Sequence, residues 1–360
     1  MSQLAGASTG HLLDRQGGVL RLKHVDVGVD FILEHSYARR DDVVIVAGTL
    51  VEGIGNACSD IDVYVITDAY RSRGEIDITK HHRVLSPDRS IIREDTEHSR
   101  EVFLVHTVVP GTAIKVDVEF KTIAEIEELF RSIDRIFDYA TQNLFLLTKR
   151  LTDREEAMVH RFFNCIPLLG EGRFNALRGR LSEPKYLYIG YRWIASDFNI
   201  LLDLIGAWQA AEIDRAVEFA RENVLLQTAA YLRLTGCTNY RRKWLLTYLK
   251  ANGDDQLLAE FTKLTYLDGT RDVAGKIAYV HRALDYVDWV FDRSRPLLSA
   301  MTRVPSGREA LELLERDRER TPPMNLYEAW EFQYRAKAYR KDPTPTRSLL
   351  GPFPDYHGEI

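Results

Sequence analysis

Two aspartates separated by one residue stand just after a glycine-containing turn in the first quarter of the chain. The segment 43–66 reads VVIVAGTLVEGIGNACSDIDVYVI, and Asp60 and Asp62 lie where its second apolar run begins. Alternate residues of a strand face the same side, so both carboxylates point toward one place while Ile61 enters the core. Like charges this close are unfavourable unless a cation neutralises them. Their oxygens suit Mg²⁺, which commonly binds a few carboxylates together with substrate phosphates.

The same segment combines a small-residue turn with these paired carboxylates. The residues G-T at 48–49, followed by S-D-I-D-V at 59–63, resemble the Gly-Ser…Asp-x-Asp signature of the DNA polymerase β-like nucleotidyltransferases. The first aspartate stands twelve residues after the glycine. That spacing is common in the stand-alone, small-molecule (antibiotic-type) branches of the family, which carry a helical C-terminal domain. The resemblance is specific over about residues 43–67 and is one of general character over the helical part.

The resemblance implies a set of functional residues. Gly48, Thr49 and Ser59 would contact the phosphates of a nucleoside triphosphate, through backbone N–H groups and hydroxyls. Asp60 and Asp62 would hold two Mg²⁺ ions between them. The co-substrate would be ATP or another nucleoside triphosphate.

A downstream strand offers a further pair of carboxylates. The run AIKVDVEF at 113–120 places Asp117 and Glu119 on one face, with valines behind them. The resemblance implies a third carboxylate on such a strand, and the apolar-Asp-apolar pattern favours Asp117 as the third metal ligand. Glu119 is then the general base for the acceptor hydroxyl or a solvated neighbour. The roles of these two residues could also be exchanged.

Two residues depart from the family pattern. Thr49 replaces the usual serine but keeps the hydroxyl, so a phosphate contact is preserved in principle. Glu52 stands where many relatives have arginine or lysine. A carboxylate at this position would not attract a triphosphate, so Glu52 is expected to point away or to contact the acceptor.

The C-terminal half contains two further groups with a candidate role. The run YRRKW at 240–244 is basic, and similar helices in small-molecule nucleotidyltransferases imply that Lys243 reaches the triphosphate; the alternative is a solvated helix face with Trp244 in the core. Aromatic residues also recur at short spacing and either line an acceptor pocket or pack in the core. These are Tyr186, Tyr188, Tyr191 and Trp193.

The histidines and cysteines indicate no second metal site. His81, His82 and His106 have no ligand partners at metal-binding spacing, so we expect them on the surface or packed. The three cysteines are odd in number and far apart, which fits neither a disulfide framework nor a zinc site.

The elements that must position these residues change in type along the chain. Short Val- and Ile-rich runs predict strands at 43–48, 61–67, 100–109 and 113–120, with further candidates at 75–79 and 81–85. Apolar spacing predicts a helix over 25–39, and Thr122 with Glu125 has the spacing of a capping box. Only helical patterns follow; they cover 122–151, 152–170, 184–208, 210–235, 239–251, 254–267, 270–295 and 306–319.

These elements predict an α+β fold with four parts. A lead-in (1–24) precedes a nucleotidyltransferase domain (25–148), whose mixed sheet has flanking helices. An all-helical domain follows (149–320). The proline-rich tail (321–360) is expected to be extended over the surface or partly disordered.

Composition and charge narrow the partners. The formal net charge of −5 and the pI of about 6.1 disfavour a protein that binds nucleic acid through phosphate contacts. The N-terminus lacks a secretory pattern and no apolar run is long enough for a membrane span, which predicts a cytoplasmic protein.

The predicted function is metal-dependent transfer of a nucleoside monophosphate, with AMP the first choice, from the triphosphate to a hydroxyl of a small molecule. Pyrophosphate is released. One alternative acceptor is a macromolecule, either a tRNA end or a partner protein as in toxin–antitoxin pairs. Another reading is an inactive nucleotide-binding module, against which the intact carboxylates argue.

Overall fold

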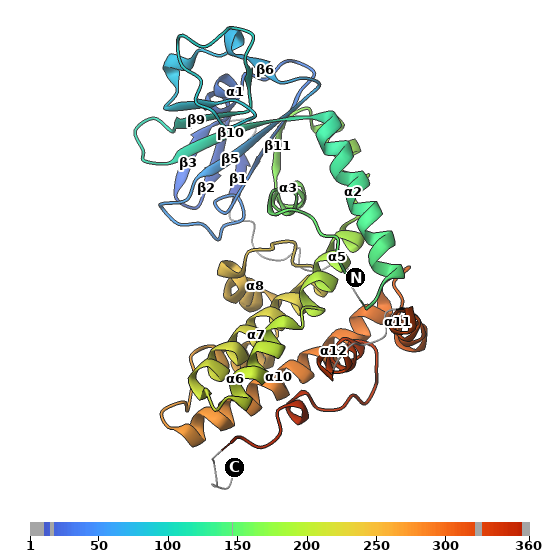
Figure 1. Ribbon diagram of the computed structural model, residues 1–360. Helices are drawn as coiled ribbons and strands as arrows, with labels where there is room; N and C mark the ends of the chain where they lie inside the picture. Colours follow the sequence, from blue (N-terminus) through green and yellow to red (C-terminus); the bar gives the residue numbers. More distant parts are fainter. Residues whose placement is uncertain (1–10, 15–17, 146, 321–325, 355–360) are drawn as a thin grey trace. The chain divides into compact units, whose positions relative to one another are not determined.

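The structure is a computed structural model that describes residues 11–14, 18–145, 147–320 and 326–354. The chain forms two compact units (Figure 1). The sheet unit comprises residues 1–132 and 153–182, and the helical unit comprises 133–152 and 183–360. The predicted α+β class is confirmed, since a mixed sheet lies in the first unit and helices make up the second.

A six-stranded sheet forms the centre of the sheet unit, with the strand order β11-β4-β5-β10-β9-β7. Strands β5 and β10 are parallel, and the other neighbouring pairs are antiparallel. Its strands are β4 (Val43–Ala47), β5 (Ile61–Thr67), β7 (Arg83–Leu85), β9 (Leu104–Val108), β10 (Lys115–Thr122) and β11 (Ile166–Leu169). The strands predicted at 43–48, 61–67 and 113–120 are therefore confirmed.

Smaller elements surround this sheet. They are a three-stranded antiparallel sheet of β1 (His11–Asp14), β2 (Val19–Leu22) and β3 (Val25–Gly28), the helix α1 (Val29–Ser36), the paired strands β6 (Arg71–Ser72) and β8 (Glu101–Val102), and the 3-10 turns η1 (Arg73–Glu75) and η2 (Ile78–Lys80). The helix predicted over 25–39 is wrong in its first four residues. Val25 and Val27 are buried and alternate with exposed neighbours, which is the period of a strand.

The strand predicted at 75–79 is also wrong. Ser72 and Glu75 form a capping box around η1, and the side chain of Asp77 accepts a hydrogen bond from Thr79 N at the start of η2. These local side-chain contacts satisfy the backbone in tight helical turns and compete with strand pairing.

One face of the six-stranded sheet carries the hydrophobic core of the sheet unit. Its buried residues come from alternate positions of the central strands and pack against the three-stranded sheet and α1. They include Val44, Val46, Ile61, Val63, Val65, Val116, Val118 and Phe120 from the strands, with Leu20, Val27 and Ile32 opposite. The strand residues between them point to the other face, which carries Asp62, Asp117 and Glu119.

Strand β11 is a correction to the prediction that only helices follow residue 122. It pairs antiparallel with β4 at the edge of the six-stranded sheet. Pro167 is tolerated because an edge strand needs hydrogen bonds on one side only. The segment 152–170 is therefore a helix and a strand of the sheet unit, although its pattern places it with the helical domain.

Helices account for the rest of the chain. The capping box of Thr122 and Glu125 is confirmed by reciprocal hydrogen bonds of 2.7 and 3.2 Å. Helix α7 contacts α5, α6 and α10 in the helical unit. The helices are α2 (Ile123–Gln142), α3 (Asp153–Phe163), α4 (Glu171–Arg178), α5 (Glu183–Ala195), α6 (Asn199–Gln209), α7 (Ile213–Leu234), η3 (Arg242–Trp244), α8 (Leu245–Asn252), α9 (Asp255–Thr265), α10 (Val273–Ala300), α11 (Gly307–Arg320), α12 (Leu326–Ala336) and η4 (Thr346–Leu349).

The tail is more ordered than its proline content predicts. Within 326–354 it forms α12 and η4 and is tied to the helical unit by buried polar groups. Gln227 Nε2 donates to the fully buried Tyr334 Oη at 2.8 Å, and Thr346 N donates to Asp288 Oδ2 at 2.6 Å. The segments 321–325 and 355–360 lie outside the described residues. In the parts of the chain that the structure describes, every helix is too short or too polar to cross a bilayer.

Candidate active site

Two of the predicted metal ligands lie side by side on the polar face of the six-stranded sheet. Asp62 of β5 and Asp117 of β10 occupy the same register of the parallel pair. Ala47 is the register partner of Asp62 on the other side, and His106 is that of Asp117. Strands separated by about fifty residues of sequence thus bring two carboxylates to neighbouring positions of one face. We call this region, with Tyr64 and Glu119 one step further along the strands, the carboxylate face.

The turn after β4 touches Asp62. Gly48 has φ +101°, a left-handed conformation that favours glycine, and a Cβ atom at this position would lie 2.7 Å from Asp62 Oδ2. Backbone hydrogen bonds close the turn, with Glu52 N donating to Gly48 O at 3.1 Å and Gly55 N donating to Thr49 O at 2.7 Å. Only a glycine lets the backbone of the turn come so close to the carboxylate.

Asp60 and Ser59 lie in the loop directly before β5. Asp60 is exposed, whereas Asp62 is largely buried. The hydroxyl of Ser59 accepts a hydrogen bond from Asn56 N at 3.0 Å. Ser59 therefore stabilises the loop that carries Asp60, and its predicted phosphate contact stays a prediction.

The electrostatics of Asp62 are those of a crowded, poorly hydrated carboxylate. Its pKa is raised to about 6, chiefly because burial disfavours the charged form. The negative charges of Asp60 and Asp117 raise this pKa further, and the guanidinium of Arg161 opposes them. An added cation at this place would therefore be favoured.

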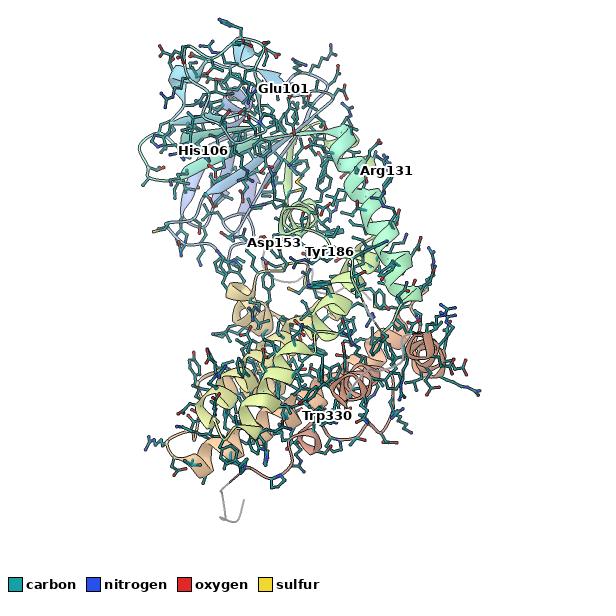
Figure 2. All side chains as sticks on the ribbon, in the orientation of Figure 1. Glu101, His106, Arg131, Asp153, Tyr186 and Trp330 are labelled. Atoms are coloured by element: carbon teal, nitrogen blue, oxygen red, sulfur yellow. The ribbon has the colours of Figure 1, made fainter. Side chains whose placement is uncertain are left out.

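Asp117 has a histidine partner that the sequence analysis does not predict. His106 Nδ1 lies 2.5 Å from Asp117 Oδ1, and both side chains are about one quarter exposed. Figure 2 labels His106 on the sheet. The expectation of a surface or packed histidine agrees with His106, which is partly buried against Asp117. It is confirmed for His81, which packs against Tyr37 with a 2.6 Å hydrogen bond and whose pKa burial lowers to about 4.

Glu119 shares the carboxylate face with Asp117, as the spacing predicts. Lys121 Nζ lies 2.8 Å from Glu119 Oε1, and Arg154 Nη2 lies 3.7 Å from the same oxygen. The carboxylate is thus flanked by two cations. Its role as a general base stays a prediction.

Helix α3 adds basic groups to this face that the sequence analysis does not identify. Arg161 Nη2 donates to Asp62 Oδ2 at 3.0 Å, and its guanidinium lies 5.3 Å from the centroid of the Tyr64 ring. His160 Nε2 lies 3.0 Å from Glu52 Oε1, so the side chain of Glu52 points toward α3. Figure 1 shows α3 beside the sheet. Helical periodicity alone does not tell which strand residues a helix meets, so the sequence carries no signal for Arg161.

The candidates of the second half of the chain belong to the helical unit. Lys243 is exposed on η3, with its Nζ 5.3 Å from the centroid of the Trp244 ring, and its triphosphate role stays a prediction. Trp244 is only half-buried. Tyr186, Tyr188 and Tyr191 lie fully buried on α5, so the core interpretation is the correct one for them (Figure 2 labels Tyr186).

Two cavities of the helical unit contain none of the residues predicted from the sequence. One has a volume of about 570 Å³ and the other about 580 Å³. The first is lined by Gln256, Glu260, Lys263, Leu264, Asp268, Arg282, Asp285, Tyr286 and Trp289. The second is lined by Thr141, Gln142, Asn143, Arg303, Pro305, Glu309, Leu313, Arg316 and Arg320.

The donor set of the carboxylate face fits a metal that is shared with a substrate. Across the described residues, no three His, Cys, Asp or Glu side chains gather closely enough to hold a metal between them. Asp62 and Asp117 form a neighbouring pair. Mg²⁺ is commonly bound in this way, by one or two carboxylates with the remaining oxygens supplied by substrate phosphates and water.

Comparisons with known proteins give a distant likeness among solved structures. The comparisons with protein-family models and with curated proteins find no match. Among solved structures, the chain is similar to a nucleotidyltransferase-like protein from Exiguobacterium sibiricum 255-15, with 12% identity and a TM-score of 0.38, over 89% of this chain and 88% of that one. The words nucleotidyltransferase-like describe that protein.

Proposed function

We propose that the protein is a metal-dependent nucleotidyltransferase that moves a nucleoside monophosphate from a nucleoside triphosphate to a hydroxyl group. The observation that supports this is the adjacency of Asp62 and Asp117 in one register, with Asp62 in contact with the Gly48 turn. A carboxylate pair beside a glycine turn is suited to a cation and to the phosphates that the cation accompanies.

Asp62 and Asp117 would hold Mg²⁺, and Asp60 would add a carboxylate from the loop before β5. When bound, Mg²⁺ neutralises charge on the triphosphate and lowers the pKa of the acceptor hydroxyl. The raised pKa of Asp62 supports this assignment, because a crowded carboxylate gains most from a cation.

The chain's own groups would position the reactants. The backbone of the Gly48 turn and the Thr49 hydroxyl would bind the phosphates. The acceptor oxygen would then bond to the α-phosphorus as the bond from that phosphorus to the β-bridging oxygen breaks. Pyrophosphate leaves, and Glu119 is the proposed recipient of the acceptor's proton. Most of the rate enhancement in such a site comes from positioning and charge stabilisation.

The proposed acceptor is a small molecule, and ATP is the proposed donor. The net charge of −5 supports this, since it gives weak long-range attraction for a nucleic acid backbone. A tRNA end or a protein side chain is the competing acceptor and becomes an outcome of the test.

The test is incubation of the protein with α-³²P-labelled nucleoside triphosphates, Mg²⁺ and a cell extract, followed by separation of small molecules, RNA and protein. We expect label in a low-mass product with the wild type and none with Asp62→Ala or Asp117→Asn. Label in RNA or in a protein band would show that the acceptor is a macromolecule, while the proposal of nucleotidyl transfer would stand. No transfer of label by the wild type to any fraction would count against nucleotidyl transfer.

A further inference from the structure

Arg161 is a basic side chain in direct contact with Asp62, one of the proposed metal ligands. Its Nη2 donates to Asp62 Oδ2 at 3.0 Å, and its guanidinium lies over the Tyr64 ring. The side chains of Arg161 and Asp62 are 23% and 17% exposed, so the pair borders solvent. A ligand can therefore reach the contact between these two groups.

The backbone of α3 is firmly placed next to Arg161. Phe162 is fully buried and forms ring contacts with Phe130 and Phe174, at centroid distances of 5.8 and 5.6 Å. On the other side, His160 pairs with Glu52. The helix is thus held on both sides of Arg161, and what can move is the long side chain of Arg161 itself.

Arg161 and the Gly48 turn both approach one oxygen atom of Asp62. Asp62 Oδ2 accepts the hydrogen bond of Arg161, and the same Oδ2 is the atom that a Cβ on Gly48 would meet at 2.7 Å. A divalent ion that binds this oxygen would compete with the guanidinium, because both are cations. Phosphates bound on the Gly48 turn would lie within reach of the released side chain. A guanidinium binds two phosphate oxygens as readily as two carboxylate oxygens.

We propose that Arg161 is a triphosphate-binding residue that serves as the counter-ion of Asp62 in the nucleotide-free protein. When a divalent ion and a nucleoside triphosphate bind, Arg161 leaves Asp62 for the phosphate oxygens. Arg161 thereby offsets the charge of Asp62 before the metal arrives and that of the phosphates afterwards. This inference rests on the proposed function.

The test separates metal binding from nucleotide binding and uses no turnover. The full-length wild type and Arg161→Gln are titrated with Mn²⁺ alone, followed by electron paramagnetic resonance, and with α,β-methylene-ATP in the presence of Mn²⁺, followed by calorimetry. Arg161→Gln should bind Mn²⁺ alone several-fold more tightly, because a competing cation is gone. It should bind the analogue about ten- to a hundredfold more weakly, the loss expected for a charge-assisted hydrogen bond.

The matched control is Arg154→Gln. Arg154 lies on the same helix and also faces a carboxylate of the sheet, Glu119, but at 3.7 Å and with 55% of its side chain exposed. The affinities of Arg154→Gln for Mn²⁺ and for the ATP analogue should both stay within twofold of the wild-type values. Arg161→Lys keeps the charge and loses the planar fork, so it should leave Mn²⁺ affinity unchanged and weaken the analogue by a few-fold. If thermal unfolding shows that Arg161→Gln does not fold, Arg161→Lys takes its place in the titrations.

The proposal predicts changes of opposite sign in Arg161→Gln: a higher affinity for Mn²⁺ and a lower affinity for the ATP analogue. If Arg161→Gln is folded and binds both probes like the wild type, the role of Arg161 is overturned while nucleotidyl transfer stands. If Arg161→Gln binds both Mn²⁺ and the ATP analogue more weakly than the wild type, Arg161 acts by shaping the site, and the proposal is overturned as well. If the wild type binds neither probe, the proposed function fails and this inference fails with it.

Discussion

The two faces of the six-stranded sheet differ in chemistry at β5 and β10, although the same strands build them. In β5, Ile61, Val63 and Val65 belong to the hydrophobic core, whereas Asp62 between them stands on the carboxylate face. β10 repeats the pattern, with Val118 in the core and Asp117 beside it in sequence. The comparison teaches that the strand period of two separates stability from chemistry at neighbouring residues. Substitutions one residue apart should therefore have effects of different kinds.

The largest effect is expected on the carboxylate face. Asp62→Ala or Asp117→Asn should lower nucleotidyl transfer by at least about a thousandfold, more than the ten- to hundredfold typical of groups that only support metal ligands. Both variants should remain folded, since these side chains are not part of the hydrophobic core. Transfer of labelled nucleotide and thermal unfolding measure the two effects. Near wild-type turnover in either variant would remove that residue from the metal site.

The second effect is a pH dependence of stability that comes from the same residue. The pKa of Asp62 is about 6 in the folded protein, and about 3.9 is usual in an unfolded chain. The folded state thus binds the proton of Asp62 more tightly than the unfolded state does. This tighter binding adds at most about 3 kcal/mol to the free energy of unfolding. The contribution is fully present below about pH 4 and is lost as the pH rises through 6.

Asp62→Asn removes this titration and is the way to measure it. The free energy of unfolding of the wild type, relative to that of Asp62→Asn, should fall by at most about 3 kcal/mol between about pH 4 and pH 7. Urea unfolding without metal at a series of pH values gives the difference. A constant difference over this range would show that Asp62 titrates like an exposed carboxylate.

Substitutions on the core face of the sheet should lower stability and leave turnover unchanged. Val118→Ala removes two buried methyl groups and should cost about 2 kcal/mol of unfolding free energy. Turnover per folded molecule should stay near the wild-type value at temperatures well below the transition. Urea unfolding and steady-state transfer assays test both parts. A Val118→Ala protein of normal stability and poor turnover would contradict the division between the faces.

The smallest effect is expected at the partner of Asp117. His106→Gln should reduce transfer about tenfold, at the lower end for a group that orients a metal ligand, with binding of Mn²⁺ weakened in proportion. His82→Gln is a suitable control, because the His82 side chain is exposed and its backbone N, which the substitution keeps, donates to His106 O at 2.9 Å. Equal activity of both variants would leave His106 as a packing residue.

The parts of the site that follow from local spacing were predictable. The alternation in IDVYVIT and KVDVEF determines which side chains share a face, and the structure has Asp117 and Glu119 together as expected. The capping box of Thr122 follows from local spacing in the same way. Such features depend on neighbours within a few residues, so a single sequence contains the information.

The parts that depend on tertiary contacts were not predictable. The register that aligns Asp62 with Asp117 joins two strands far apart in sequence, and the contact from Arg161 to Asp62 spans 99 residues. The run IPLL of β11 is too short for periodicity to distinguish a strand from the end of a helix. In the tail, the proline content favours an extended chain, whereas α12 forms there and its buried Tyr334 is stabilised by hydrogen bonds with Gln227 and Asn223 of α7.

The late position of β11 has a consequence for how the chain is made. The neighbouring strand β4, VVIVA, is buried along its whole length, but its outer edge is paired only when Leu169 has left the ribosome. The stretch between Ala47 and Leu169 takes on the order of ten seconds to synthesise. During that time an apolar strand edge is open to other nascent chains. A chaperone that shields this edge would therefore raise the yield of native protein more than one acting after release, and a fragment that ends before residue 166 should aggregate.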